Sequence, residues 1–386
     1  IYVFDPTVND PLSKVRGVGR YLQILKENFG KTWIFTNDLS AMEQSNNETI
    51  FINPFFNFLQ YPLTMRRIAK KQVAVIHDLI PLKYPEHFPI GVRGKLNIFL
   101  NKLALKNYDL IITDSETSKD DIMKILRMDE NKIKVIYPCL PKIFSISKPQ
   151  IPITNQAPIP NEKNKKIFGN WKLEIGNSFC LYVGDATWNK NLVNLAKTIK
   201  IINVTCVFVG KTFEILKPVQ DDKIDRTSEV EEDPDVTSGD GKTSEVKFEN
   251  AWQKELKEFN KETRGDKRFI FLGYVPDEEL ILLYQKARCN LLVSRDEGFG
   301  FSYLEAASQA CPSVLSNTQV LHEISINQGA LFANPDNPNE IANTIGEVYF
   351  NNEVRSKLGI EAKRRTKYFN NKKFISDFYK VLNFNI

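Results

Sequence analysis

The residues with the clearest capacity for chemistry lie in the segment CNLLVSRDEGFGFSYLE, at positions 289–305. An apolar run ends at Ser294, a turn with two glycines follows, and a helix is predicted next. Glu297 lies in the turn and Glu305 in the helix, with seven residues between them. One carboxylate can accept hydrogen bonds from ligand hydroxyl groups near the turn, and the other from hydroxyl groups one or two helical turns further along. The N–H groups of residues 298–301 can face an anion at the helix N-terminus. The plainer interpretation is a strand-to-helix turn with a surface glutamate.

Three further segments place reactive groups at the ends of apolar runs. In YVGDATWNKN, Lys190 stands at a predicted helix start, where a flexible cation suits a diphosphate. In RGVGRY, Gly17 and Gly19 open a helix between two arginines, which is typical of a phosphate loop. In VAVIHDLIPL, a buried strand delivers His77 and Asp78 at its carboxyl end, where they could bond sugar hydroxyls or exchange a proton. A solvated lysine, an ordinary helix start and a structural His-Asp pair are the respective alternatives.

Several short motifs resemble known nucleotide- or metal-binding motifs but lack the residues or the setting that such sites require. Both GKT tripeptides, at Gly210 and Gly241, lack the earlier glycine that a P-loop needs. Asp233 and Asp235 form an Asp-x-Asp, but in an acid-rich stretch with no apolar strand before it. There are three histidines, none spaced as metal ligands on one helix, and no G-x-S-x-G elbow. The sequence therefore predicts neither a metal site nor a serine hydrolase.

Short apolar runs alternate with amphipathic helical patterns, which predicts an α/β fold with parallel sheets covered on both faces. Strands are expected at 1–4, 32–36, 49–52, 73–77, 109–113, 133–136, 179–183, 204–209, 268–272, 289–293, 312–316 and 329–332. Helices are expected at 17–29, 93–107, 116–127, 190–202, 250–263, 276–287, 303–310, 338–350, 352–367 and 371–383.

The length of 386 residues and a Pro-, Asn- and Lys-rich stretch at 141–178 predict two Rossmann-like domains joined by a linker. Ligands of such sheets bind outside the carboxyl ends of the strands, so two facing domains would form a site in the cleft between them. Residues 218–249 are acidic and rich in Ser, Thr and Gly, and they are interpreted as a solvated surface insertion, with partner docking as the alternative.

Charge and composition narrow the partners and the location. The net charge is +5, yet residues 220–249 hold eleven acids and four bases, so the remaining chain is basic and suits phosphate-bearing ligands or an anionic membrane surface. Nucleic acid is not expected, since no RNA- or DNA-binding motif is present. No apolar run reaches membrane-spanning length, and the first residues are not typical of a signal peptide. The five cysteines are interpreted as buried thiols. A cytoplasmic location is expected, with peripheral contact at the inner face of the membrane left open.

Taken together and in this order, these segments resemble glycosyltransferase family 4, the retaining GT-B transferases. The resemblance covers most of the chain, and Glu297-x7-Glu305 is its most specific motif. It implies a first domain over 1–165, a nucleotide-sugar domain over 166–370 and a final helix, 371–386, that packs back on the first domain. The matching segments are RGVGRY, HDLIPLKYPEHFP, IITDSETSKDDI, LYVGDATWNKNL, FLGYVPDEELILLYQKA and SRDEGFGFSYLEAASQACPSVLSN.

The resemblance assigns a role to each matched residue. Glu297 would contact the donor sugar, Glu305 the ribose hydroxyls, and Lys190 the diphosphate, while His77 would contact the hexose or the reacting centre. Many members carry an arginine where this chain has Asp185 and Asn189, so neutralisation of the diphosphate rests on Lys190, with Arg295 or Arg20 as helpers. The donor-binding set implied is Gly17, Gly19, Lys190, Arg295, Glu297, Gly298, Phe299, Gly300, Phe301 and Glu305, and the catalytic set is Glu297, His77 and Lys190.

The expected reaction moves a hexose, with mannose favoured, from a nucleotide-diphosphate sugar to a glycan or lipid-linked acceptor in polysaccharide biosynthesis, with retention and without a metal. GDP-mannose is the first choice of donor, and UDP- and dTDP-sugars stay open. A sugar-nucleotide epimerase or hydrolase on the same fold, and a non-catalytic partner subunit, are the alternatives.

Overall fold

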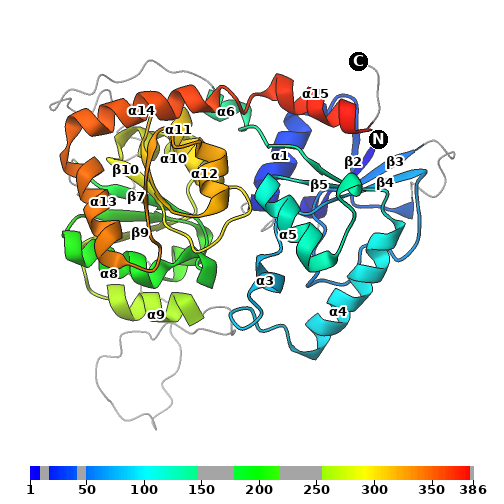
Figure 1. Ribbon diagram of the computed structural model, residues 1–386, viewed down its shortest axis with the longest axis horizontal. Coiled ribbons are helices and arrows are strands. Elements are labelled where there is room, and N and C mark those ends of the chain that lie inside the picture. The colour runs from blue at the N-terminus through cyan, green and yellow to red at the C-terminus, as the bar shows by residue number, and fades with distance from the viewer. Residues whose placement is uncertain (9–16, 41–48, 146–177, 217–253, 383–386) are drawn as a thin grey trace, which may run out of the picture.

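A computed structural model describes residues 1–8, 17–40, 49–145, 178–216 and 254–382. Figure 1 shows two lobes side by side, each built around its own sheet. The blue-to-cyan lobe on the right is called the first domain here, and the green-to-orange lobe on the left is called the second domain. Each consists of parallel strands with helices on both faces.

The sheet of the first domain has the strand order β2-β1-β3-β4-β5-β6, and all its pairings are parallel. Its strands are β1 (Tyr2–Phe4), β2 (Ile34–Thr36), β3 (Ile50–Asn53), β4 (Lys71–Val75), β5 (Leu110–Thr113) and β6 (Ile133–Val135). Its helices are α1 (Gly17–Phe29), α3 (Ile80–Lys83), α4 (Gly91–Ala104) and α5 (Glu116–Leu126), and α6 (Lys142–Ser145) leads toward the second domain.

The sheet of the second domain has the order β12-β11-β10-β7-β8-β9 and is also parallel throughout. Its strands are β7 (Cys180–Val183), β8 (Cys206–Val209), β9 (Phe269–Gly273), β10 (Cys289–Leu292), β11 (Ser313–Ser316) and β12 (Ala330–Ala333). Its helices are α8 (Leu192–Ile202), α9 (Lys254–Thr263), α10 (Asp277–Lys286), α11 (Phe301–Ser308), α12 (Gln319–Ser325), α13 (Pro338–Phe350) and α14 (Asn352–Thr366).

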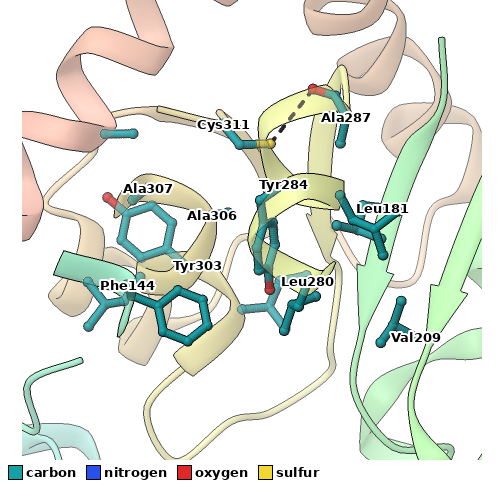
Figure 2. Packing of buried hydrophobic residues seen from close by; sticks show 14 of the residues in the cluster. Phe144, Leu181, Val209, Leu280, Tyr284, Ala287, Tyr303, Ala306, Ala307 and Cys311 are labelled. Carbon is teal, nitrogen blue, oxygen red and sulfur yellow. Dashed lines mark hydrogen bonds between the residues drawn. The ribbon is translucent and has the colours of Figure 1, made fainter. Parts of the chain in front are cut away.

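Hydrophobic side chains fill both faces of each sheet, which explains why the strands read as continuous apolar runs. One core of the second domain is drawn in Figure 2, where Tyr284 of α10 lies among Ala306 of α11, Leu181 of β7 and Leu280. Phe144 of α6 joins the same cluster, so the chain leaving the first domain is anchored in the second.

The last helix, α15 (Asn371–Leu382), returns to the first domain and lies beside α1 (Figure 1). Phe374 and Phe378 are buried in the core that also contains Phe29 and Trp33. The Phe378 ring meets those of Phe29 and Trp33 edge-on, with centroids 5.4 and 5.6 Å apart. Such aromatic contacts fix the return of the chain, and with it the placement of the second domain.

The two-domain Rossmann-like α/β fold predicted from the sequence is confirmed, and a strand overlaps each of the twelve predicted ranges. The sequence patterns missed α12 and the short helices α3 and α6. They also placed the start of α11 two residues too late, because Gly300 rather than a polar cap begins that helix. The proposed boundary at 165/166, most of the linker, the acidic insertion 218–249 and residues 383–386 lie outside the described residues.

Candidate active site between the two domains

Sheet topology brings the candidate residues together from four strand ends. In the second domain, β7 and β10 are neighbours, so the loop that carries Lys190 lies beside the turn that carries Glu297. In the first domain, β4 and β5 are neighbours, so the residues after them, His77 and Asp114, also meet. Because parallel strands end at the same edge, each domain presents its polar loops on one side.

Lys190 and Glu297 form an ion pair at the edge of the second sheet. The Lys190 Nζ lies 2.7 Å from the Glu297 Oε1, and the Ser294 hydroxyl donates to the same oxygen at 2.6 Å. Partial burial alone would lower the pKa of Lys190, but the carboxylate of Glu297 raises it above its ordinary value. Lys190 therefore stays a cation at neutral pH.

Two glycines shape the turn between Glu297 and α11. A Cβ added to Gly298 would lie 2.8 Å from the backbone oxygen of His77, so only glycine permits this approach of the two domains. Gly300 has a φ of +99° and is the N-cap of α11, a left-handed conformation that favours glycine. The buried Phe299 and the half-buried Phe301 hold the turn against the cores. The first N–H groups of α11 thus follow closely after Glu297 along the chain, and a helix N-terminus favours an anion.

Glu305 is buried inside α11, with only 4% of its surface exposed. Its Oε1 lies 3.0 Å from the Arg20 Nε, and its Oε2 accepts a hydrogen bond of 3.1 Å from the Tyr284 hydroxyl. The Nη1 and Nη2 atoms of Arg20 also donate hydrogen bonds to the two carboxylate oxygens of Asp277, at 2.6 and 2.7 Å. Burial raises the pKa of Glu305 even though Arg20 opposes the shift.

His77 pairs with Asp114 on the first-domain side of the site. The His77 Nδ1 lies 2.5 Å from the Asp114 Oδ2, and its Nε2 lies 3.0 Å from the Pro54 carbonyl oxygen. Burial alone would lower the pKa of His77, but the Asp114 carboxylate raises it above the ordinary value. Two acceptors on the two ring nitrogens favour the imidazolium, so a sugar hydroxyl would have to compete with Pro54 for Nε2.

The domains touch directly around these groups. The hydroxyls of Ser115 and Ser118 donate to the Gly298 carbonyl oxygen at 2.8 and 3.2 Å. Asp296, next to Glu297, receives the Lys83 ammonium at 2.8 Å and the Tyr84 hydroxyl at 3.1 Å. The described structure is therefore a closed arrangement, in which both strand-end clusters face one another.

The remaining predicted residues are Arg295, Gly17, Gly19 and Arg20. The Arg295 guanidinium donates to the Trp188 carbonyl oxygen at 2.8 Å and lies 5.1 Å from the centre of the Trp188 ring. Its nearest carboxylates are those of Asp336 at 3.7 Å and Glu255 at 3.9 Å. Gly17 and Gly19 form the first turn of α1, and the loop before them lies outside the described residues. The Arg20 guanidinium, expected as a helper at the diphosphate, is paired with the carboxylates of Glu305 and Asp277.

Sequence reasoning missed Asp114, Tyr284 and Asp277 as members of the site. Asp114 could have been found, since it follows the apolar run LIIT as His77 follows its own strand. Tyr284 and Asp277 lie on α10, whose pattern reads as an ordinary amphipathic helix. Only the packing of α10 against α11 shows that they contact Glu305 and Arg20.

In the described part of the chain, no group of three or more His, Cys, Asp and Glu side chains is arranged to hold a metal ion. Asp233 and Asp235 lie outside the described residues. Among the described helices, none is long and apolar enough to cross a membrane.

The chain is similar in sequence to known proteins. The family model for glycosyl transferases group 1 matches residues 163–365, slightly more than half of the chain. The chain is 28% identical over 273 residues to the O-antigen chain mannosyltransferase RfbU of Salmonella typhimurium, which covers 70% of this chain and 58% of that protein. It is 43% identical over 72 residues to the O-antigen chain mannosyltransferase B of Escherichia coli, or 19% of each chain.

The fold also matches solved structures. Anabaena HepE in complex with UDP and glucose superimposes with a TM-score of 0.66 at 14% identity, over 99% of this chain and 98% of that one. At this identity, the likeness concerns the fold.

Proposed function

Because the chain belongs to the glycosyl transferases group 1, we propose that this transferase moves a hexose, with mannose the first choice, from a nucleotide-diphosphate sugar to a hydroxyl group. The acceptor is a glycan or a lipid-linked glycan in polysaccharide biosynthesis, and the anomeric configuration is retained. The mannosyltransferase names of the two bacterial relatives support mannose and the class of acceptor, although the chain spans little more than half the length of the first.

One observation carries the proposal. The Lys190 ammonium lies 2.7 Å from Glu297, which stands in the turn that leads into α11, and Glu305 lies within that helix. A cation and helix N–H groups suit a diphosphate, and carboxylates suit sugar and ribose hydroxyls. GDP-mannose is the proposed donor, and UDP- and dTDP-sugars are the alternatives to test.

In the proposed reaction, the acceptor oxygen forms a bond to the anomeric carbon while the bond from that carbon to the diphosphate oxygen breaks. Acceptor and leaving group lie on the same face of the sugar, and the acceptor proton passes to the leaving diphosphate. Lys190 and the α11 N–H groups stabilise the charge that grows on the leaving oxygen. Glu297 orients the sugar. His77, which pairs with Asp114, lies on the first-domain side of the site. No metal is required in this scheme.

Nucleotide screening followed by turnover tests the proposal. GDP, UDP and dTDP are compared by thermal shift, where a ligand at about 100 times its Kd adds about 2.7 kcal/mol. The matching sugar nucleotides are then incubated with and without a mannan-type oligosaccharide. Product formation only with the acceptor supports the transferase. Turnover without any acceptor would indicate a hydrolase or epimerase, and nucleotide binding without turnover would indicate a non-catalytic subunit.

A further inference from the structure

Helix α4 exposes a continuous apolar stripe on its outer face. The exposed fractions are 86% for Val92, 55% for Leu96, 59% for Phe99 and 37% for Leu103. Their spacings of four, three and four residues place all four side chains within about 60° of one another around the helix axis. Figure 1 shows α4 along the lower edge of the first domain. None of the site residues described above belongs to α4.

The inner face of α4 is held by small and polar residues together with Ile98, which packs against the core of the first domain. Gly94, Asn101 and Ala104 are the buried positions of the helix. The Asn101 side-chain amide donates to the Gln60 carbonyl oxygen at 2.7 Å, and the Asn97 amide donates to that of Leu59 at 2.9 Å. The helix therefore carries large apolar side chains on two faces, and the outer four remain exposed in addition to the inward-packed Ile98. Folding of the domain does not account for these side chains, because burial of large apolar groups is what normally drives packing.

The charges around the stripe have one sign. Residues 87–108 contain four basic residues and no acidic one. Lys95, Lys102 and Lys106 line one flank of the stripe and Arg93 the other, and all four are exposed. Two more exposed apolar side chains, Tyr61 and Met65, belong to the segment whose backbone is bonded to this region of the chain.

We propose that α4 docks on the surface of an anionic lipid bilayer, with Val92, Leu96, Phe99 and Leu103 inserted below the headgroups and the flanking lysines at the level of the phosphates. An apolar stripe one helix wide, bordered by cations without an intervening acid, matches the chemistry of an anionic interface. A second copy of this chain fits less well, because two such faces would bring like charges together. The surface is independent of the nature of the donor, so it goes beyond the proposed transfer reaction.

Vesicle sedimentation of the full chain tests the docking. The protein is mixed with vesicles of phosphatidylglycerol and phosphatidylcholine in equal parts, and with vesicles of phosphatidylcholine alone. We expect binding to the anionic vesicles that weakens as salt is raised. The double variant Leu96→Ser/Phe99→Ser should bind at least about tenfold more weakly, because two inserted apolar side chains are lost. Phe350→Ser, at a side chain 67% exposed on α13 of the second domain, is the matched control and should bind like the wild type.

Both variants are checked for an unchanged melting temperature and unchanged nucleotide binding, which separates docking from folding and from the transfer reaction. The proposal is overturned if the wild type ignores anionic vesicles, or if the double variant binds them as well as the wild type does. It is equally overturned if size-exclusion chromatography shows a wild-type dimer that the double variant abolishes while neither protein binds vesicles. That result would assign the stripe to an interface between copies of the chain.

Discussion

The guanidinium of Arg20 lies 3.0 Å from the carboxylate of Glu305. This ion pair joins helix α1 of the first domain to the buried Glu305 in α11 of the second domain. Both side chains are largely enclosed, and Asp277 holds the other side of the guanidinium. A nucleotide whose ribose reached Glu305 would therefore meet a carboxylate that is already oriented. We therefore propose that Arg20 serves the proposed ribose site by positioning Glu305.

Removing Arg20 should make nucleotide binding more sensitive to acid. Burial already raises the pKa of Glu305 and Arg20 opposes that rise, so Arg20→Gln should raise the pKa further. Protonation of Glu305 removes an ionised acceptor worth roughly 1.5–3 kcal/mol. As pH falls, nucleotide affinity measured by calorimetry should drop in the variant at a higher pH than in the wild type. Glu305→Ala should bind weakly and without this pH step, and parallel curves for the wild type and Arg20→Gln would contradict the prediction.

Lys190→Ala should reduce turnover by about 10²–10³, more than it weakens nucleotide binding, because the leaving oxygen gains charge in the transition state. Lys190→Arg should recover only part of the rate, since a guanidinium needs more room. Lys197→Ala, at an exposed position of α8, is the control and should keep full activity. A Lys190→Ala enzyme within a few-fold of the wild type would show that the diphosphate is held elsewhere.

The pair of His77 and Asp114 should stabilise the fold at acid pH. The pKa of His77 is raised in the folded state, so its contribution is complete below the ordinary histidine pKa and is lost as pH rises through the raised value. Asp114→Asn leaves a buried imidazolium without its counter-charge, a cost of up to about 3–5 kcal/mol at low pH. Urea unfolding at a series of pH values should show the two proteins converging as pH rises. A constant difference would mean that the pair is not ionised.

Gly298→Ala should impair turnover by holding the domains apart. The added Cβ would meet the His77 carbonyl oxygen at 2.8 Å, and backbone cannot move aside as a flexible side chain can. Nucleotide binding to the second domain should persist, whereas the rate of transfer should fall at least about tenfold, since small misplacements are costly in catalysis. The control is Gly346→Ala, where the Cβ would make an ordinary 3.5 Å contact and the helix should gain up to about 1 kcal/mol.

Activity should survive EDTA, because Lys190 and the α11 N–H groups are proposed to carry the charge that a metal would otherwise neutralise. The measurement is the transfer rate before and after dialysis against the chelator. Loss of activity that Mn²⁺ or Mg²⁺ restores would mean that a metal takes part, and Asp233 and Asp235 would be the first residues to replace.

The spacing of apolar residues along the chain was enough to predict the strands, most helices and the two-domain class. Strands and helices repeat with different periods, and the spacing of apolar residues follows those periods. It also placed Glu297, Lys190 and His77 at strand ends, where parallel sheets bind ligands. The exposure of the apolar stripe on α4 was not visible in this way. An apolar stripe predicts a buried face by default, and only the fold shows that Asn97 and Asn101 point inward instead.

Tertiary structure alone decided which strand ends meet and which charges pair. The sheet orders put β7 beside β10 and β4 beside β5, and neither order follows from chain order. Asp114 therefore became the partner of His77, and Arg20 the partner of Glu305 across 285 positions of sequence. Contacts of this kind depend on how the two domains pack through α15 and Gly298. The sequence determined which groups are available at this site, whereas packing over long separations determined which of them touch.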